Sequence, residues 1–105
     1  MKKLALLLII FSFGTLYSQT NQFTITGRVL DSETKETLAG ANVLLTSNKN
    51  DSKHFALTDK QGKFSIEKVP QGSYKLKITF IGYEAYEKEI KVNSREKSNL
   101  GDILV

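Results

Sequence analysis

Apolar and polar residues alternate along most of the chain after residue 22. In the clearest segment, residues 73–81, one face carries Tyr74, Leu76, Ile78 and Phe80, and the other carries Lys75, Lys77 and Thr79. A period of two residues is that of a β-strand with one buried face. A slip of one residue in register would bury the lysines, so the pattern predicts both a strand and its orientation.

Other segments carry the same alternation, and strands are predicted near residues 23–29, 41–45, 54–58, 63–68, 86–92 and 100–105. Their predicted inward residues are Phe23, Ile25, Gly27, Val29, Ala41, Val43, Leu45, Phe64, Ile66, Tyr86, Ile90, Val92, Ile103 and Val105. Leu44 falls on the opposite face of its strand. No segment longer than a turn has helical periodicity. The pattern therefore predicts an all-β sandwich of about seven strands, with two sheets packed about 10 Å apart.

Turn-forming residues separate the predicted strands. Asp59 and Gly62 are expected to reverse the chain, because Asp caps its own backbone and Gly tolerates positive φ. Pro70 and Gly72 predict a second reversal one strand later. Gly82 is expected to bend the chain after the strand that ends at residue 81. This spacing of turns is typical of small β-sandwiches.

Residues 1–18 have the layout of a secretory signal peptide: two lysines, an apolar run over 4–11, and small residues over 14–18. The apolar run is well short of the roughly 20 residues that a membrane-spanning helix needs, so a retained anchor is the weaker interpretation. Cleavage is expected after Ser18, with Gly14 as the alternative. We predict a signal peptide over residues 1–18, one domain over 19–105, and no transmembrane segment in the mature chain.

The composition excludes several classes of protein. The 105 residues contain no cysteine, which rules out a lipid attached through cysteine and any disulfide framework. Residues 1–18 contain two lysines and no acidic residue, so their removal lowers the formal net charge from +4 to +2. The remaining lysines are interleaved with acidic residues rather than gathered into a stripe. Nucleic-acid binding is therefore not expected.

Candidate catalytic groups are few. His54 is the only histidine, and without cysteine there is no residue set for a transition-metal cluster or a Cys-His nucleophile. We expect a solvated histidine at the edge of a loop. The turn at residues 59–62 is not expected to bind calcium, since Lys60 and Lys63 add positive charge where a cation site needs oxygen ligands. The sequence thus predicts no catalytic residue, no metal and no cofactor, and a protein that is not an enzyme.

Tyr83 and Tyr86 are the candidate ligand-facing aromatic residues. Aromatic faces stack on sugars and tyrosine hydroxyls add hydrogen bonds, so carbohydrate binding is the alternative function. Tyr74 and Phe80 lie on the apolar face of their strand and are expected in the core. Tyr83 follows the bend at Gly82 and is expected to pack over the end of the sandwich.

A series of turn and core positions runs through the chain from residue 25 to residue 105. The series comprises Gly27, Val29, Asp31, Leu38, Gly40, Ala41, Asn42, Val43, Thr58, Asp59, Gly62, Phe64, Val69, Pro70, Gly72, Tyr74, Gly82 and Tyr83. Its order and spacing resemble the carboxypeptidase regulatory-like (transthyretin-like) domain family. The resemblance implies a Greek-key sandwich in which these residues hold turns and core. It implies no catalytic residue.

Domains of this family directly behind a signal peptide are typical of the N-terminal periplasmic extension of TonB-dependent outer-membrane receptors. The resemblance therefore implies a non-catalytic module in the periplasm or at the periplasmic face of the outer membrane, with envelope or outer-membrane proteins as partners. A free-standing module and the head of a longer receptor both stay open. The expected contact surfaces are a sheet edge, which offers unpaired backbone groups for strand addition, and the loops at residues 31–37 and 47–53.

Overall fold

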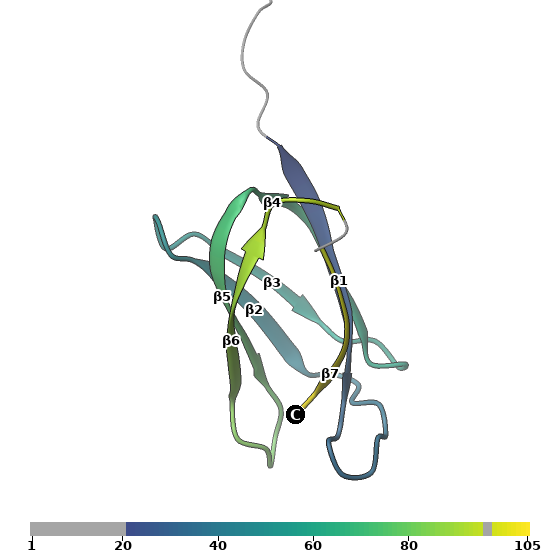
Figure 1. Cartoon of the computed structure of the whole chain (residues 1–105). Helices are drawn as coiled ribbons and strands as arrows, with labels where there is room; N and C mark the ends of the chain where they lie inside the picture. The colour runs from purple at the N-terminus through teal and green to yellow at the C-terminus, as the bar shows by residue number, and fades with distance from the viewer. Residues whose placement is uncertain (1–20, 96–97) are drawn as a thin grey trace, which may run out of the picture.

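A computed structural model describes residues 21–95 and 98–105, and the predicted signal peptide lies outside these residues. The described chain forms seven strands: β1 Gln22–Leu30, β2 Asn42–Ser47, β3 Lys53–Leu57, β4 Lys63–Pro70, β5 Gly72–Thr79, β6 Tyr86–Val92 and β7 Asn99–Leu104. The strands form two sheets that face each other (Figure 1). The all-β sandwich predicted from the alternation is confirmed.

The two sheets are built from strands that are distant in sequence. One sheet has the order β4-β1-β7 and the other the order β3-β2-β5-β6. Strand β1 is antiparallel to β4 and parallel to β7, whereas every pair in the four-stranded sheet is antiparallel. The chain changes sheet after β1, β3, β4 and β6. Strands β3 and β6 are consequently the edges of the four-stranded sheet.

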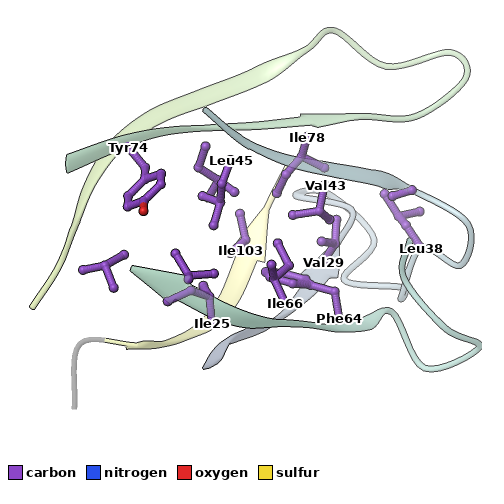
Figure 2. Packing of buried hydrophobic residues seen from close by; sticks show 14 residues of the cluster. Ile25, Val29, Leu38, Val43, Leu45, Phe64, Ile66, Tyr74, Ile78 and Ile103 are labelled. Atoms are coloured by element: carbon purple, nitrogen blue, oxygen red, sulfur yellow. The ribbon is translucent and has the colours of Figure 1, made fainter. Parts of the chain in front are cut away.

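The hydrophobic core lies between the sheets and consists largely of the predicted inward faces. In Figure 2, Leu45 and Ile78 of the four-stranded sheet point toward Ile25 and Ile66 of the three-stranded sheet. Side chains such as Ile25, Leu45 and Ile78 are at most 1% exposed. Burying an aliphatic side chain of this size contributes about 1.5–3 kcal/mol. The alternation along β5 therefore predicted its buried face correctly.

Strand β5 ends at Thr79, before the predicted end at residue 81. The last ladder pair with β6 joins Ile78 to Tyr86, and the chain then turns, with the Tyr83 N–H donating to the Phe80 carbonyl at 3.0 Å. Phe80 packs against the core, but Ile81 is 92% exposed. The predicted strand end was wrong because alternation continues into the turn, beyond the point where the neighbouring strand can pair.

Asp59 holds the turn between β3 and β4. Its Oδ1 atom accepts hydrogen bonds from the backbone N–H groups of Gln61 at 2.8 Å and Lys63 at 2.9 Å. Its carbonyl accepts the Gly62 N–H at 2.9 Å. Gly62 has φ of 77°, which lies in the left-handed region that glycine adopts readily. The carboxylate is therefore engaged by backbone donors, as in an Asx-turn.

The other predicted turn positions lie in varied settings. Pro70 ends β4 and Gly72 begins β5, so these two residues flank the second reversal. Gly40 lies in the loop that leads to β2, and Gly82 in the turn after β5. Gly27 lies within β1 and pairs with Phe64 of β4.

Candidate functional site

Asp31 and Tyr83 are far apart in sequence and meet at one end of the sandwich. The Tyr83 hydroxyl donates to Asp31 Oδ2 at 2.5 Å, while Asp31 Oδ1 accepts the backbone N–H groups of Glu33 at 2.7 Å and Thr34 at 2.9 Å. The Tyr83 ring also packs edge-on against Phe80, with ring centroids 5.5 Å apart. Tyr83 thus ties the loop after β1 to the turn after β5.

These hydrogen bonds set the protonation behaviour of the pair. The Tyr83 hydroxyl, and then the N–H groups of Thr34 and Glu33, lower the pKa of Asp31 from 3.8 to about 2, because hydrogen bonds to a carboxylate favour its charged form. The same contact raises the pKa of Tyr83. The hydroxyl and the carboxylate are therefore both engaged within the fold.

The Tyr83→Phe variant is expected to lose a contribution to the unfolding free energy that the original chain itself loses at low pH. Because the folded pKa of Asp31 lies below its unfolded value, the stabilisation is present above about pH 4 and is lost as the pH falls toward about 2. The difference in unfolding free energy between the original chain and Tyr83→Phe should therefore shrink over that window. Denaturant titrations at several pH values measure it. Tyr86→Phe is the control, and a Tyr83→Phe difference that does not change with pH would contradict the assignment.

Tyr86, the second candidate aromatic residue, lies in a different environment. It is half-buried against the core and lines a groove of about 300 Å³ with Leu100 and Ile103 of β7. Tyr86 begins β6, whereas Tyr83 belongs to the turn before it. The two rings therefore have separate structural roles, and the Tyr83 hydroxyl already has an internal partner.

The environment of His54 corrects the expectation of a solvated histidine. Its ring lies edge-on to Tyr74 with centroids 5.9 Å apart, and within the described residues its Nε2 is the buried side-chain polar atom that lacks a hydrogen-bond partner. His54 pairs with Leu45 of β2, whose side chain points into the core. Residues paired in a ladder share a face, so His54 is turned inward.

The inward turn of His54 places large apolar side chains on the outer surface of β3. Phe55 is 58% exposed and Leu57 is 56% exposed, although single exposed apolar residues are ordinary. Here the two are alternate residues of one edge strand. Half-buried Leu44 of β2 pairs with Phe55 and extends the apolar surface along the outer face, from the edge toward the middle of the sheet. We call Phe55, Leu57 and Leu44 the β3 patch.

The outer edge of β3 also offers unpaired backbone groups. The Ser52 carbonyl accepts the N–H of Ser47 in β2 at 2.8 Å, and the Thr58 N–H donates to the carbonyl of Ala41, just before β2, at 3.0 Å. Alternate residues of an antiparallel strand bond to the same neighbour, so the backbone groups of Lys53, Phe55 and Leu57 point away from β2. The β3 patch therefore lies beside a row of backbone donors and acceptors that another strand can use.

A groove of about 620 Å³ borders the patch at Leu57. It crosses the three-stranded sheet and is lined by Lys63 of β4, Arg28 of β1 and Asp102 of β7. Arg28 Nε and Nη2 donate to the two carboxylate oxygens of Asp102, each at 3.0 Å. These hydrogen bonds lower the pKa of Asp102 and raise that of Arg28. Sequence reasoning missed this pair, because its partners are joined only through the parallel pairing of β1 and β7.

Two further observations bear on the chemistry of the described residues. Over residues 21–95 and 98–105, no group of three or more His, Cys, Asp or Glu side chains is arranged to hold a metal ion. Within the same part of the chain, no helix is long and apolar enough to cross a membrane.

The fold defines the class of protein: a small seven-stranded β-sandwich module with an apolar edge strand. The chain belongs to the carboxypeptidase regulatory-like domain family, whose profile matches residues 24–105. The resemblance seen in the sequence is thereby confirmed. No curated protein matches the chain significantly in sequence.

Several solved structures share the fold. A three-domain backbone pilin of Streptococcus pyogenes is 27% identical, with 69% of this chain and 16% of the pilin covered and a TM-score of 0.59. The shaft pilin SpaA of Lactobacillus rhamnosus GG is 20% identical, with 82% and 47% covered and a TM-score of 0.59. Chlorocatechol 1,2-dioxygenase of Pseudomonas putida is 12% identical, with 85% and 57% covered and a TM-score of 0.60.

The chain spans less than two thirds of the length of each of these proteins. They include pilins and a dioxygenase, so their common fold does not by itself indicate an activity. A function must therefore be argued from the surface of this chain.

Proposed function

We propose that this chain is an exported, non-catalytic module that acts by protein contact in the cell envelope. The observation that carries the proposal is the β3 edge, where Phe55 and Leu57 are more than half exposed beside unpaired backbone groups. An exposed apolar edge strand favours association with other polypeptides. Family membership over residues 24–105 adds the expectation of an accessory domain.

The partner class that we propose is a protein of the outer-membrane uptake machinery, of the TonB-dependent receptor type. The basic start, short apolar run and small residues of positions 1–18 support export. Export would place the module in the periplasm or at the periplasmic face of the outer membrane. There it acts either alone or as the head of a longer receptor.

Photo-crosslinking in cells tests the proposal. A photoreactive amino acid placed at position 55 is expected to capture an envelope protein, because the side chain there is exposed on an edge strand. The same probe at Lys91, an exposed position on β6 at the other edge of the sheet, is the matched control. Mass spectrometry identifies the captured protein. Absence of envelope proteins from the products at every exposed position would refute the function.

Carbohydrate binding by Tyr83 and Tyr86 is the alternative proposal. The contacts of Tyr83 weigh against it, since its hydroxyl is bonded to Asp31 and its ring packs on Phe80. A glycan array distinguishes the two functions. A glycan signal that Tyr86→Ala abolishes, with the fold retained, would restore the carbohydrate interpretation.

A further inference from the structure

We propose that β3 is the docking edge for an extended acidic polypeptide segment, which adds to the four-stranded sheet as a new strand. The inference rests on the proposed function, because it names the surface and the kind of partner that a protein-contact module would use. It combines three features of the described residues: the open backbone edge, the β3 patch, and the distribution of charge around the strand.

The order of side chains along β3 determines what an added strand would meet. On the outer face the strand presents Lys53, then Phe55, then Leu57. Directly opposite residues on neighbouring strands have Cβ atoms about 4.5–5.5 Å apart. An added strand therefore gains most from apolar residues beside Phe55 and Leu57, and from an acidic residue beside Lys53.

The charge of the surroundings extends this preference beyond one residue. Residues 49–63 contain four lysines and two aspartates, and Asp59 Oδ1 already accepts two backbone hydrogen bonds. Exposed Lys63 lines the groove next to Leu57, at the end of β3 opposite Lys53. Each end of the docking edge therefore carries a lysine, and at the Leu57 end Asp59 lines the groove together with Lys63.

The acidic residues of β6 do not neutralise this edge. Glu87 and Glu89 lie on β6, at the far side of the sheet, where they pair with Lys77 and Lys75 in the ladder. Within the part of the chain that the structure describes, the ion pair within 4.0 Å joins Arg28 and Asp102. The lysines at the two ends of β3 thus remain available to an acidic partner.

The same charges argue against a second copy of this chain as the occupant. Pairing two β3 strands edge to edge would bring the end lysines of two copies close together, and like charges across a strand pair are destabilising. The segment that fits has the pattern acidic-x-apolar-x-apolar-x-acidic, with its alternate residues on the outer face. Backbone hydrogen bonds supply affinity in such strand addition, and the alternate side chains supply specificity.

A peptide titration tests the inference on the chain purified after export. The probe is the capped heptapeptide Asp-Ser-Val-Thr-Phe-Ser-Glu, and the control replaces its two acidic residues with lysine. Amide chemical shifts of the isotope-labelled chain report both affinity and position. The acidic peptide is expected to shift Lys53–Leu57 and to bind about tenfold more tightly than the control. Equal binding of both peptides, or shifts confined to β6, would overturn the inference.

Variants of β3 separate charge from backbone pairing. Lys53→Glu is expected to weaken binding of the acidic peptide about threefold to tenfold, whereas Lys91→Glu on the opposite edge leaves it unchanged. Phe55→Pro removes an N–H that points away from β2, so it should abolish binding. The fold should be retained, because proline is tolerated on an edge strand. If Phe55→Pro disturbs the β5 amide signals, Phe55→Lys takes its place and should weaken binding at least about tenfold. Unchanged binding in these variants would refute the docking edge.

The outcomes also separate this inference from the proposed function. If Phe55→Lys leaves crosslinking to an envelope partner from other positions intact, the function stands and the docking edge is wrong. If no envelope protein is captured but the acidic peptide binds at β3, the function fails and the docking edge stands. A dimer in sedimentation equilibrium that Phe55→Lys dissociates would identify a second copy as the occupant and overturn the acidic segment.

Discussion

Replacement of Gly62 by alanine is expected to lower the free energy of unfolding by on the order of 3 kcal/mol. Gly62 is buried with φ of 77°, and an added Cβ would lie 2.7 Å from the Val29 carbonyl oxygen. That oxygen accepts the Leu38 N–H at 3.0 Å, and the Val29 N–H donates to the Gly62 carbonyl at 2.8 Å. The turn cannot move away without breaking these bonds. Chemical denaturation of the purified chain measures the loss.

Gly40 provides a matched control for this substitution. Its φ of 80° is nearly the same, but an added Cβ would meet no atom within 4 Å. Gly40→Ala should therefore lose only the conformational contribution, about 1 kcal/mol. The difference between the two variants isolates the clash with the Val29 carbonyl. Equal losses in both variants would show that backbone conformation alone sets the effect.

Phe64→Ala is expected to lower the free energy of unfolding by about 3–5 kcal/mol, the usual range for truncating a buried aromatic residue. Phe64 is 4% exposed, and its ring lies across Gly27, where a Cβ would come within 2.8 Å of its Cε2 and Cζ atoms. The ring thus fills the space that the missing side chain of Gly27 leaves. Since small domains have only about 5–15 kcal/mol of stability, the denaturation midpoint should fall sharply.

The control for Phe64→Ala is Phe55→Ala, which truncates a phenylalanine that is 58% exposed and should change stability by less than about 1 kcal/mol. If Phe64→Ala does not fold, Phe64→Leu retains most of the side-chain volume and reports the same site. Gly27→Ala should destabilise the original chain more than it destabilises Phe64→Leu, by about 0.5–3 kcal/mol of coupling. Strict additivity would contradict the packing of the ring on Gly27.

The alternation predicted β5 well because one orientation of the strand suits both of its faces. Burying Lys75 and Lys77 without partners would be costly, and the orientation that keeps them on the outer face buries Leu76. The end of β5 was predicted less well. Phe80 continues the alternation, but the ladder with β6 stops at Ile78, and no sequence rule marks that point.

Strand β3 shows where alternation cannot choose between two faces. Its sequence places His54 and Ala56 on one face and Phe55 and Leu57 on the other, and hydrophobicity alone would turn the second pair inward. The ladder with β2 aligns His54 with buried Leu45 and Ala56 with buried Val43. Register with a strongly patterned neighbour therefore overrides the preference of the weaker strand. The exposed β3 patch, on which both proposals depend, follows from that override.

The sequence by itself determined the class of fold, most of the strand positions, the inward faces of β4 and β5, and the Asp59–Gly62 turn. These features depend on residues near one another along the chain, where period-two patterning and turn chemistry act locally. Only the tertiary structure decided that β3 is an edge, that Tyr83 bonds to Asp31, and that Arg28 pairs with Asp102. Each of these depends on strand order and register, which arise when distant segments bury their apolar faces together.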